Sequence, residues 1–143
     1  MPVTLPIIRA RARLLLEDSN ALNYSDDALD EAVRQALADY CTAAGETITV
    51  SGLDGAAATT LPAADEALLV GGVSAYAVFA KAAGRALQYD LNQQVDDTLF
   101  AWAKIALQRY RDNLRGVKRR LLRTAAAPPY APLEDESNQA GGL

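Results

Sequence analysis

Seven basic residues near the carboxyl end of the sequence are its strongest candidates for binding chemistry. They share the segment 109–123 with a single acid, Asp112, and are Arg109, Arg111, Arg115, Lys118, Arg119, Arg120 and Arg123. Guanidinium and ammonium groups pair with carboxylates and phosphates. This basic run can therefore bind an acidic protein surface or nucleic acid. A helix face that is merely solvated is the ordinary alternative.

A proline-bearing tail follows the basic run. Pro128, Pro129 and Pro132 surround Tyr130, and three consecutive acids come next. Prolines remove backbone donors and disfavour helix at the preceding residue. The tail, residues 125–143, is therefore predicted to be extended and able to dock in a groove, with plain disorder as the alternative. The predicted partner interface consists of Arg115, Lys118, Arg119, Arg120, Arg123 and Tyr130.

Charge is divided unevenly along the chain. Its formal net charge is −4, but residues 1–100 carry 6 basic and 14 acidic residues, whereas residues 101–143 carry 8 and 4. An acidic body with a basic end can attract an acidic protein or another copy of itself. Binding of DNA along the whole molecule is not expected, because the body would repel phosphates.

The composition argues against an enzyme. The chain has no histidine and one cysteine, Cys41, so it can form no intramolecular disulfide and none of the common zinc sites. Ser74 follows Gly71-Gly72 but has no histidine to activate it, and no phosphate-binding glycine loop is present. Ser74 and Cys41 are interpreted as packing residues. We predict no catalytic residue, no cofactor and no metal.

No membrane or secretory segment is expected. Arg9, Arg11 and Arg13 interrupt the apolar start of the chain. The longest uncharged stretch, residues 67–80, is too short to cross a bilayer of about 30 Å. A single cysteine is compatible with a reducing compartment. These features predict a soluble cytoplasmic protein.

The elements that must position the basic run are predicted to be helices. Alanine is abundant and aromatic residues are few, which favours packed helices over a sheet. Apolar spacing predicts helices over about residues 5–17, 26–44, 65–89 and 95–123. Ser25 is placed to cap the second helix and Gly45 to end it.

Three details of these helices are open to a structural test. An apolar stripe on the first is predicted to consist of Ile7, Ile8, Leu14 and Leu15. In the third, Gly71 and Gly72 leave room for another helix, or they bend or break it. The second half of the fourth is predicted to project beyond the core.

One segment has β character. Residues 47–50 are rich in β-branched side chains, residues 51–55 supply turn chemistry, and residues 58–61 form a candidate return strand. The prediction is therefore a hairpin at about residues 46–61 that packs on the helices or joins a sheet shared with a neighbouring subunit. The fold class is mainly α: a bundle of about four helices with one hairpin in residues 1–124, followed by the tail.

This layout resembles the head–tail connector (portal adaptor) proteins of long-tailed bacteriophages. The resemblance covers about residues 4–124 and consists of a short first helix, a brief β segment that ends at Leu61-Pro62, and a long basic final helix. Two further stretches contribute to it: Asn23-Tyr24-Ser25-Asp26-Asp27-Ala28-Leu29 and Ala86-Leu87-Gln88-Tyr89-Asp90-Leu91-Asn92.

The resemblance implies a structural virion protein of the neck. Such proteins form a ring, commonly of twelve copies, that joins the portal to the next neck component, a stopper or tail terminator. DNA passes through the lumen without specific binding. Family members often dock through C-terminal elements, which would give the basic helix end and the tail a role in binding the portal or an adjacent subunit.

Two other classes of function remain open at this stage. A small nucleic-acid-binding module, such as a packaging accessory or a regulator, would use the same basic helix on phosphates. A small enzyme is the more distant alternative, because nothing in the sequence pairs a nucleophile with a base.

Overall fold

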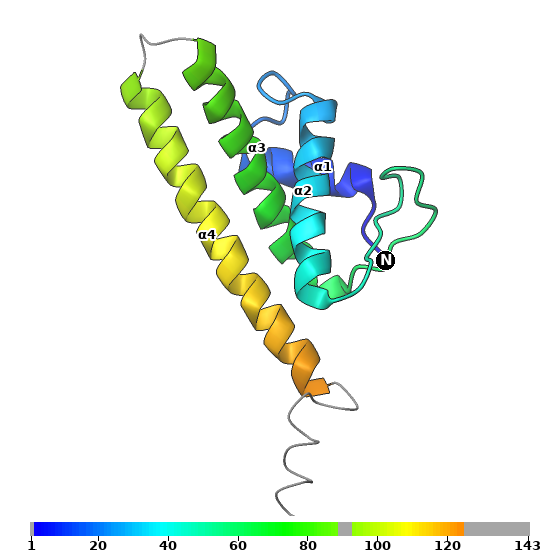
Figure 1. Cartoon of the computed structure of the whole chain (residues 1–143). Helices are drawn as coiled ribbons and strands as arrows, with labels where there is room; N and C mark the ends of the chain where they lie inside the picture. Colours follow the sequence, from blue (N-terminus) through cyan, green and yellow to red (C-terminus); the bar gives the residue numbers. More distant parts are fainter. Residues whose placement is uncertain (1, 89–92, 125–143) are drawn as a thin grey trace, which may run out of the picture.

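The described part of the chain is a bundle of four α-helices. The computed structural model describes residues 2–88 and 93–124 (Figure 1). The elements follow in the order α1 (Leu5–Leu15), α2 (Asp26–Ala44), the short 3-10 helix η1 (Ala63–Asp65), α3 (Glu66–Gln88) and α4 (Gln93–Thr124). The predicted helices are thus confirmed, whereas the predicted end of the third at Tyr89 lies outside the described residues.

Helix α3 is the centre of the bundle. It packs against α1, α2 and α4. Helices α3 and α4 lie side by side and run in opposite directions, and α2 lies on the other side of α3 (Figure 1). Leu69 and Val73 on α3 are fully buried. The core therefore forms where the other three α-helices face α3.

The ends of α2 follow from local side-chain chemistry. The Ser25 hydroxyl accepts a hydrogen bond from the Ala28 N–H at 3.1 Å, and Asp26 and Asp27 lie in the first turn. At the other end Gly45 has a φ of 73° and donates its N–H to the Cys41 carbonyl. Glycine adopts this left-handed conformation without steric penalty. Both predicted caps are confirmed.

Helix α1 ends earlier than predicted. Glu17 adopts a φ of 53°, its N–H donates to the Leu14 carbonyl, and the Asp18 N–H donates to the Arg13 carbonyl. These are the hydrogen bonds of a Schellman motif, formed here without glycine. The absence of glycine explains why the pattern gave no sign of the helix end at Leu15.

The apolar stripe predicted for α1 is wrong at three of its four positions. Ile8 is fully buried, but Ile7, Leu14 and Leu15 are 43%, 69% and 62% exposed. The buried face instead consists of Leu5, Ile8 and Ala12, which recur at helical spacings of three and four residues. The end of α1 consequently presents large apolar side chains to solvent.

A buried carboxylate joins α1 to α2. Asp18 accepts hydrogen bonds from the N–H groups of Leu22, Asn23 and Tyr24 and from the Arg13 guanidinium. Burial by itself would raise the pKa of Asp18, but the three backbone hydrogen bonds and the charge of Arg13 outweigh it and lower that pKa. The negative charge therefore organises the loop between the two helices.

The predicted hairpin is not confirmed, because the described part of the chain contains no β-strand. The two arms do lie together: the Thr60 N–H donates to the Thr49 carbonyl at 2.9 Å. However, the Thr49 N–H is satisfied by the Thr60 hydroxyl, and the Ser51 N–H by the Thr59 hydroxyl. Threonine hydroxyls therefore accept the hydrogen bonds that the backbone carbonyls of a partner strand would accept in a β-sheet.

The same segment packs on the helices, which is one of the two placements that the sequence left open. Ile48, Val50, Leu53 and Leu61 are buried in the core. Two hydrogen bonds join it to the start of the chain: the Leu5 N–H donates to the Ser51 carbonyl at 2.9 Å, and the Thr59 hydroxyl donates to the Val3 carbonyl. The segment closes the bundle at the end where α1 begins and α2 stops.

The glycine pair of α3 permits a close helix contact. The helix continues through Gly71 and Gly72 without a break. A Cβ on Gly72 would lie 2.6 Å from carbon atoms of the Tyr110 ring, whereas a Cβ on Gly71 would meet nothing within 4 Å. Tyr110 is buried, and its hydroxyl donates to the Ala36 carbonyl on α2 at 2.5 Å. One side chain of α4 thus contacts both α2 and α3.

The second half of α4 does not project beyond the core, which corrects the prediction. Tyr110, Leu114 and Val117 belong to the main core cluster, and Leu121 packs against it. Trp102, in the first half of α4, is instead 50% exposed. The basic end of α4 is therefore anchored to the bundle by its inner face.

We expect Gly72→Ala to destabilise the protein although alanine favours helix. The added methyl group would overlap the Tyr110 ring, which its hydroxyl holds against Ala36. Overpacking of this kind costs about 1–3 kcal/mol, more than the roughly 1 kcal/mol that alanine contributes to helix stability. Urea unfolding should therefore show a lower free energy of unfolding.

Gly71→Ala is the matched control, because its methyl group meets open space. This variant should be as stable as the parent chain or more stable. Equal stabilisation by both substitutions would contradict the close contact between α3 and α4.

Candidate partner-binding surface

The outer side of the last three turns of α4 forms a basic face, which we define as Arg115, Lys118, Arg119 and Arg123. All four side chains are exposed. Arg115 lies 3.4 Å from the Asp112 carboxylate, an ion pair along the helix. Lys118, Arg119 and Arg123 form no ion pair with other described residues. This part of the predicted interface is therefore available to a partner.

Arg120 differs from the other predicted interface residues, because it also binds inside the molecule. Its guanidinium donates to both carboxylate oxygens of Asp65, at 3.2 and 2.6 Å. The Tyr40 hydroxyl donates to the same carboxylate at 2.5 Å. The Asp65 side chain is 5% exposed and that of Arg120 49%. Arg120 therefore ties α4 to α2 and η1.

Burial and hydrogen bonding have opposite effects on the pKa of Asp65. Burial by itself would raise the pKa of its carboxyl, but the hydrogen bonds from Arg120 and Tyr40 outweigh it and hold that pKa below its usual value. Burial and the hydrogen bond to Asp65 both raise the pKa of the Tyr40 hydroxyl. The carboxylate stays charged and the phenol neutral at pH 7, as a stable network requires.

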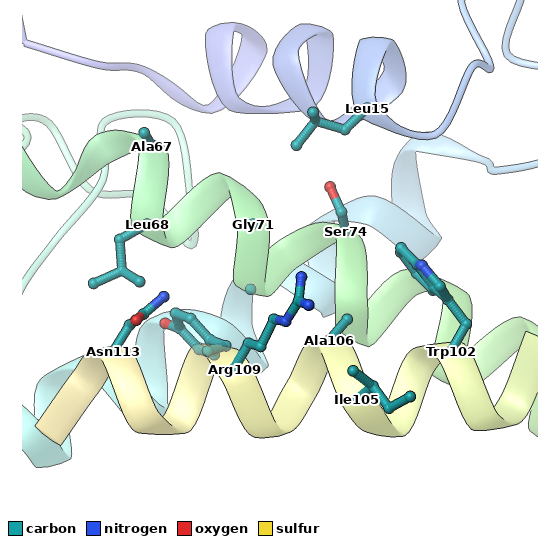
Figure 2. Close-up of a pocket in the computed structure, with 12 residues that line it drawn as sticks. Leu15, Ala67, Leu68, Gly71, Ser74, Trp102, Ile105, Ala106, Arg109 and Asn113 are labelled. Atoms are coloured by element: carbon teal, nitrogen blue, oxygen red, sulfur yellow. The ribbon is translucent and has the colours of Figure 1, made fainter.

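A second feature, which the sequence did not predict, is a groove between α1, α3 and α4. It has a volume of about 550 Å³. Figure 2 shows α3 between the two walls, with Leu15 on α1 at one side and Trp102, Ile105, Arg109 and Asn113 along α4 at the other. A signal that could have revealed the groove is that Trp102 and Ile105 do not share the helical spacing of the buried residues Ala103, Leu107, Tyr110, Leu114 and Val117.

The groove and the basic face occupy successive parts of α4. Asn113 and Arg109 line the groove, whereas Arg115, Arg111 and Lys118 line a shallow hollow beside α2. On α4 the groove is lined by residues between Trp102 and Asn113, and the basic face begins at Arg115. The molecule thus offers two separate surfaces, one basic and one largely apolar.

Ser74 and Cys41, whose side chains could act as nucleophiles, both form hydrogen bonds within the fold. No group of three or more Asp, Glu or Cys side chains within the described residues could hold a metal ion. The Ser74 hydroxyl donates to the Val70 carbonyl at 3.0 Å inside α3, as its interpretation as a packing residue requires. Cys41 is partly buried, and its sulfur accepts the Ile48 N–H at 3.3 Å. These contacts assign structural roles to both side chains.

Two predicted features of the interface lie outside the described residues. Tyr130 belongs to residues 125–143, and so does the tail as a whole. Their role in binding therefore stays a prediction from the sequence.

One segment, Ala63–Gly84, is apolar and long enough to cross a membrane by length and composition. It comprises η1 and most of α3, and half of its most apolar window is buried inside the bundle. Because α3 contacts the three other helices, its apolar character is accounted for by its place in the core.

Comparison of the chain with protein-family models, with curated proteins and with solved structures finds no match.

The network around Asp65 predicts how stability depends on pH. A carboxyl whose pKa is lower in the folded state stabilises that state above its unfolded pKa, and this contribution is lost as the pH falls through the folded pKa. The free energy of unfolding should therefore decrease between pH 7 and pH 3. In Asp65→Asn the decrease should be smaller, because one of the responsible carboxyls is gone.

Urea unfolding at the two pH values measures this effect. Glu17→Gln is the control and should retain the parent difference, because this exposed side chain forms no ion pair or side-chain hydrogen bond with other described residues. If Asp65→Asn showed the same decrease as the parent chain, the Asp65 carboxylate would not stabilise the fold through its charge.

Proposed function

We propose that this protein is a structural connector of the phage neck, a ring-forming adaptor that joins the portal to the next neck component. In the virion it would occupy the head–tail interface, and in the host cytoplasm it would await assembly. A stopper or tail terminator would bind on the distal side, and DNA would pass through the lumen of a ring, twelve-fold by analogy with the family that the sequence resembles. The protein would act without catalysis or cofactor.

The observation that carries the proposal is the basic face at the end of an anchored helix. Tyr110, Leu114 and Val117 fix the inner side of α4 in the core, while Lys118, Arg119 and Arg123 stand exposed on the outside. A rigid helix loses less conformational entropy on binding than a flexible arm would. The face is thus suited to dock on an acidic surface of the portal or of an adjacent subunit.

The charge of the rest of the chain supports the same proposal. Residues 1–100 carry 14 acids and 6 basic residues. A net negative wall does not retain DNA, since phosphate binding depends on lysine and arginine. A ring of such subunits could also pair acidic and basic surfaces of neighbouring copies.

A nucleic-acid-binding module is the second candidate, and one observation favours it. The three side chains Lys118, Arg119 and Arg123 are exposed and form no ion pair with other described residues, so they could contact phosphates. Salt dependence distinguishes the candidates. Several phosphate contacts would make DNA affinity fall steeply with salt, whereas the connector should bind DNA negligibly even at low salt.

Partner capture tests the proposal directly. The tagged full chain, recovered from cells that express its neighbouring proteins and treated with nuclease, should retain a large ring-forming portal protein that mass spectrometry identifies. The double variant Arg119→Glu, Arg123→Glu should bind that portal at least about tenfold more weakly, because two attractive charges become repulsive.

Lys104→Glu is the control for charge on α4. Lys104 is exposed in the first half of the helix, away from the basic face, so portal binding should be unchanged. Recovery of DNA alone, with all protein partners lost after nuclease treatment, would refute the connector and favour the nucleic-acid module. Equal portal binding by both variants would place the interface elsewhere.

A further inference from the structure

The groove between α1, α3 and α4 exposes large apolar side chains to solvent. Leu15, Trp102 and Ile105 are 62%, 50% and 59% exposed at its walls. Gly71 lines it without a side chain, so the floor is low at that point. Concave and largely apolar surfaces with a few polar groups are typical of binding sites. The groove is therefore a candidate docking site for an apolar segment.

The charge of the groove restricts that occupant. Among the described residues that line it, Arg109 is the one with a charge, and none is an acid. Arg109 forms no ion pair with other described residues. A segment with apolar side chains beside one or more carboxylates would satisfy both the walls and this guanidinium. The expected occupant is thus a short apolar segment with acidic flanks.

The chain itself contains such a segment directly after α4. Residues 128–133 read Pro-Pro-Tyr-Ala-Pro-Leu, and residues 134–136 read Glu-Asp-Glu. Three prolines limit the conformations that the free segment can adopt, which lowers the entropy lost on docking. Its combination of apolar residues with adjoining acids matches the chemistry of the groove.

The geometry of α4 places the segment within reach. Trp102, Asn113 and Thr124 are spaced by 11 residues, which is close to three helical turns, so all three lie on nearly the same side of α4. Trp102 and Asn113 line the groove, and Thr124 ends the helix about 16 Å beyond Asn113 at 1.5 Å per residue. About five extended residues cover that distance.

We propose that residues 128–136 fold back along α4 and dock in the groove of their own chain. Pro128 to Leu133 cover the apolar walls, and the acids that follow interact with Arg109. A tether of a few residues gives the segment a high effective concentration at its own groove, which favours this arrangement over docking on a second copy. The inference concerns the free chain and does not rest on the proposed function.

Trp102 provides the readout, because it is the only tryptophan of the chain and lines the groove. In the full chain its emission should lie at a shorter wavelength and be less quenched by acrylamide than in Leu133→Asp, which puts a charge into the apolar segment. Gln139→Asp is the matched control, since it adds the same charge beyond the docking segment. Identical emission and quenching for all three proteins would overturn the proposal.

A second pair of variants blocks the groove itself. Gly71→Leu fills the floor, and Gly84→Leu adds the same side chain to an open position elsewhere on α3. Leu133→Asp should shift the emission in the Gly84→Leu background and leave it unchanged in the Gly71→Leu background. A shift of equal size in both backgrounds would mean that the segment acts at another place.

Dilution separates the chain's own segment from that of a second copy. Intramolecular docking predicts an emission maximum that does not depend on protein concentration. A maximum that moves to longer wavelength on dilution, together with dissociation of an oligomer, would overturn the intramolecular arrangement in favour of exchange between copies.

Discussion

The arrangement of the helices depends on one close approach, that of the Tyr110 ring to the backbone of α3 at Gly72. A Cβ at position 72 would lie 2.6 Å from ring atoms, and the same ring ends in a hydroxyl that donates to the Ala36 carbonyl on α2. Burial raises the pKa of that hydroxyl, so it remains a donor at neutral pH. The contact fixes how deeply α4 sits, and hence which of its sides faces solvent. Both the basic face and the groove follow from that orientation.

Much of the fold could be predicted from the sequence, because its signals are local. Ser25 and Gly45 mark the ends of α2 by hydrogen bonds to residues within the same helix. The predicted hairpin is not confirmed, for a reason that residue propensities do not reveal. The hydroxyls of Thr59 and Thr60 accept hydrogen bonds from the N–H groups that a second strand would have bound. Glu17 likewise ends α1 in a conformation that usually indicates glycine.

The candidate surfaces were predictable to different degrees. The exposure of Arg119 and Arg123 follows from the apolar spacing of α4, which directs them away from the core. The attachment of Arg120 to Asp65 could not be predicted, since the two residues are 55 positions apart and meet only when η1 folds against α4. The groove needs three helices at once, so its walls emerge only from their packing.

The ion pair between Arg120 and Asp65 also determines how the molecule would carry mechanical load. It lies one turn from the end of α4, and Tyr40 extends it to α2. A pull on the end of α4 would therefore be shared among three elements through charged hydrogen bonds, in addition to the apolar contacts along the helix. The end of α4 would therefore bend less under load than a helix end held by apolar contacts alone.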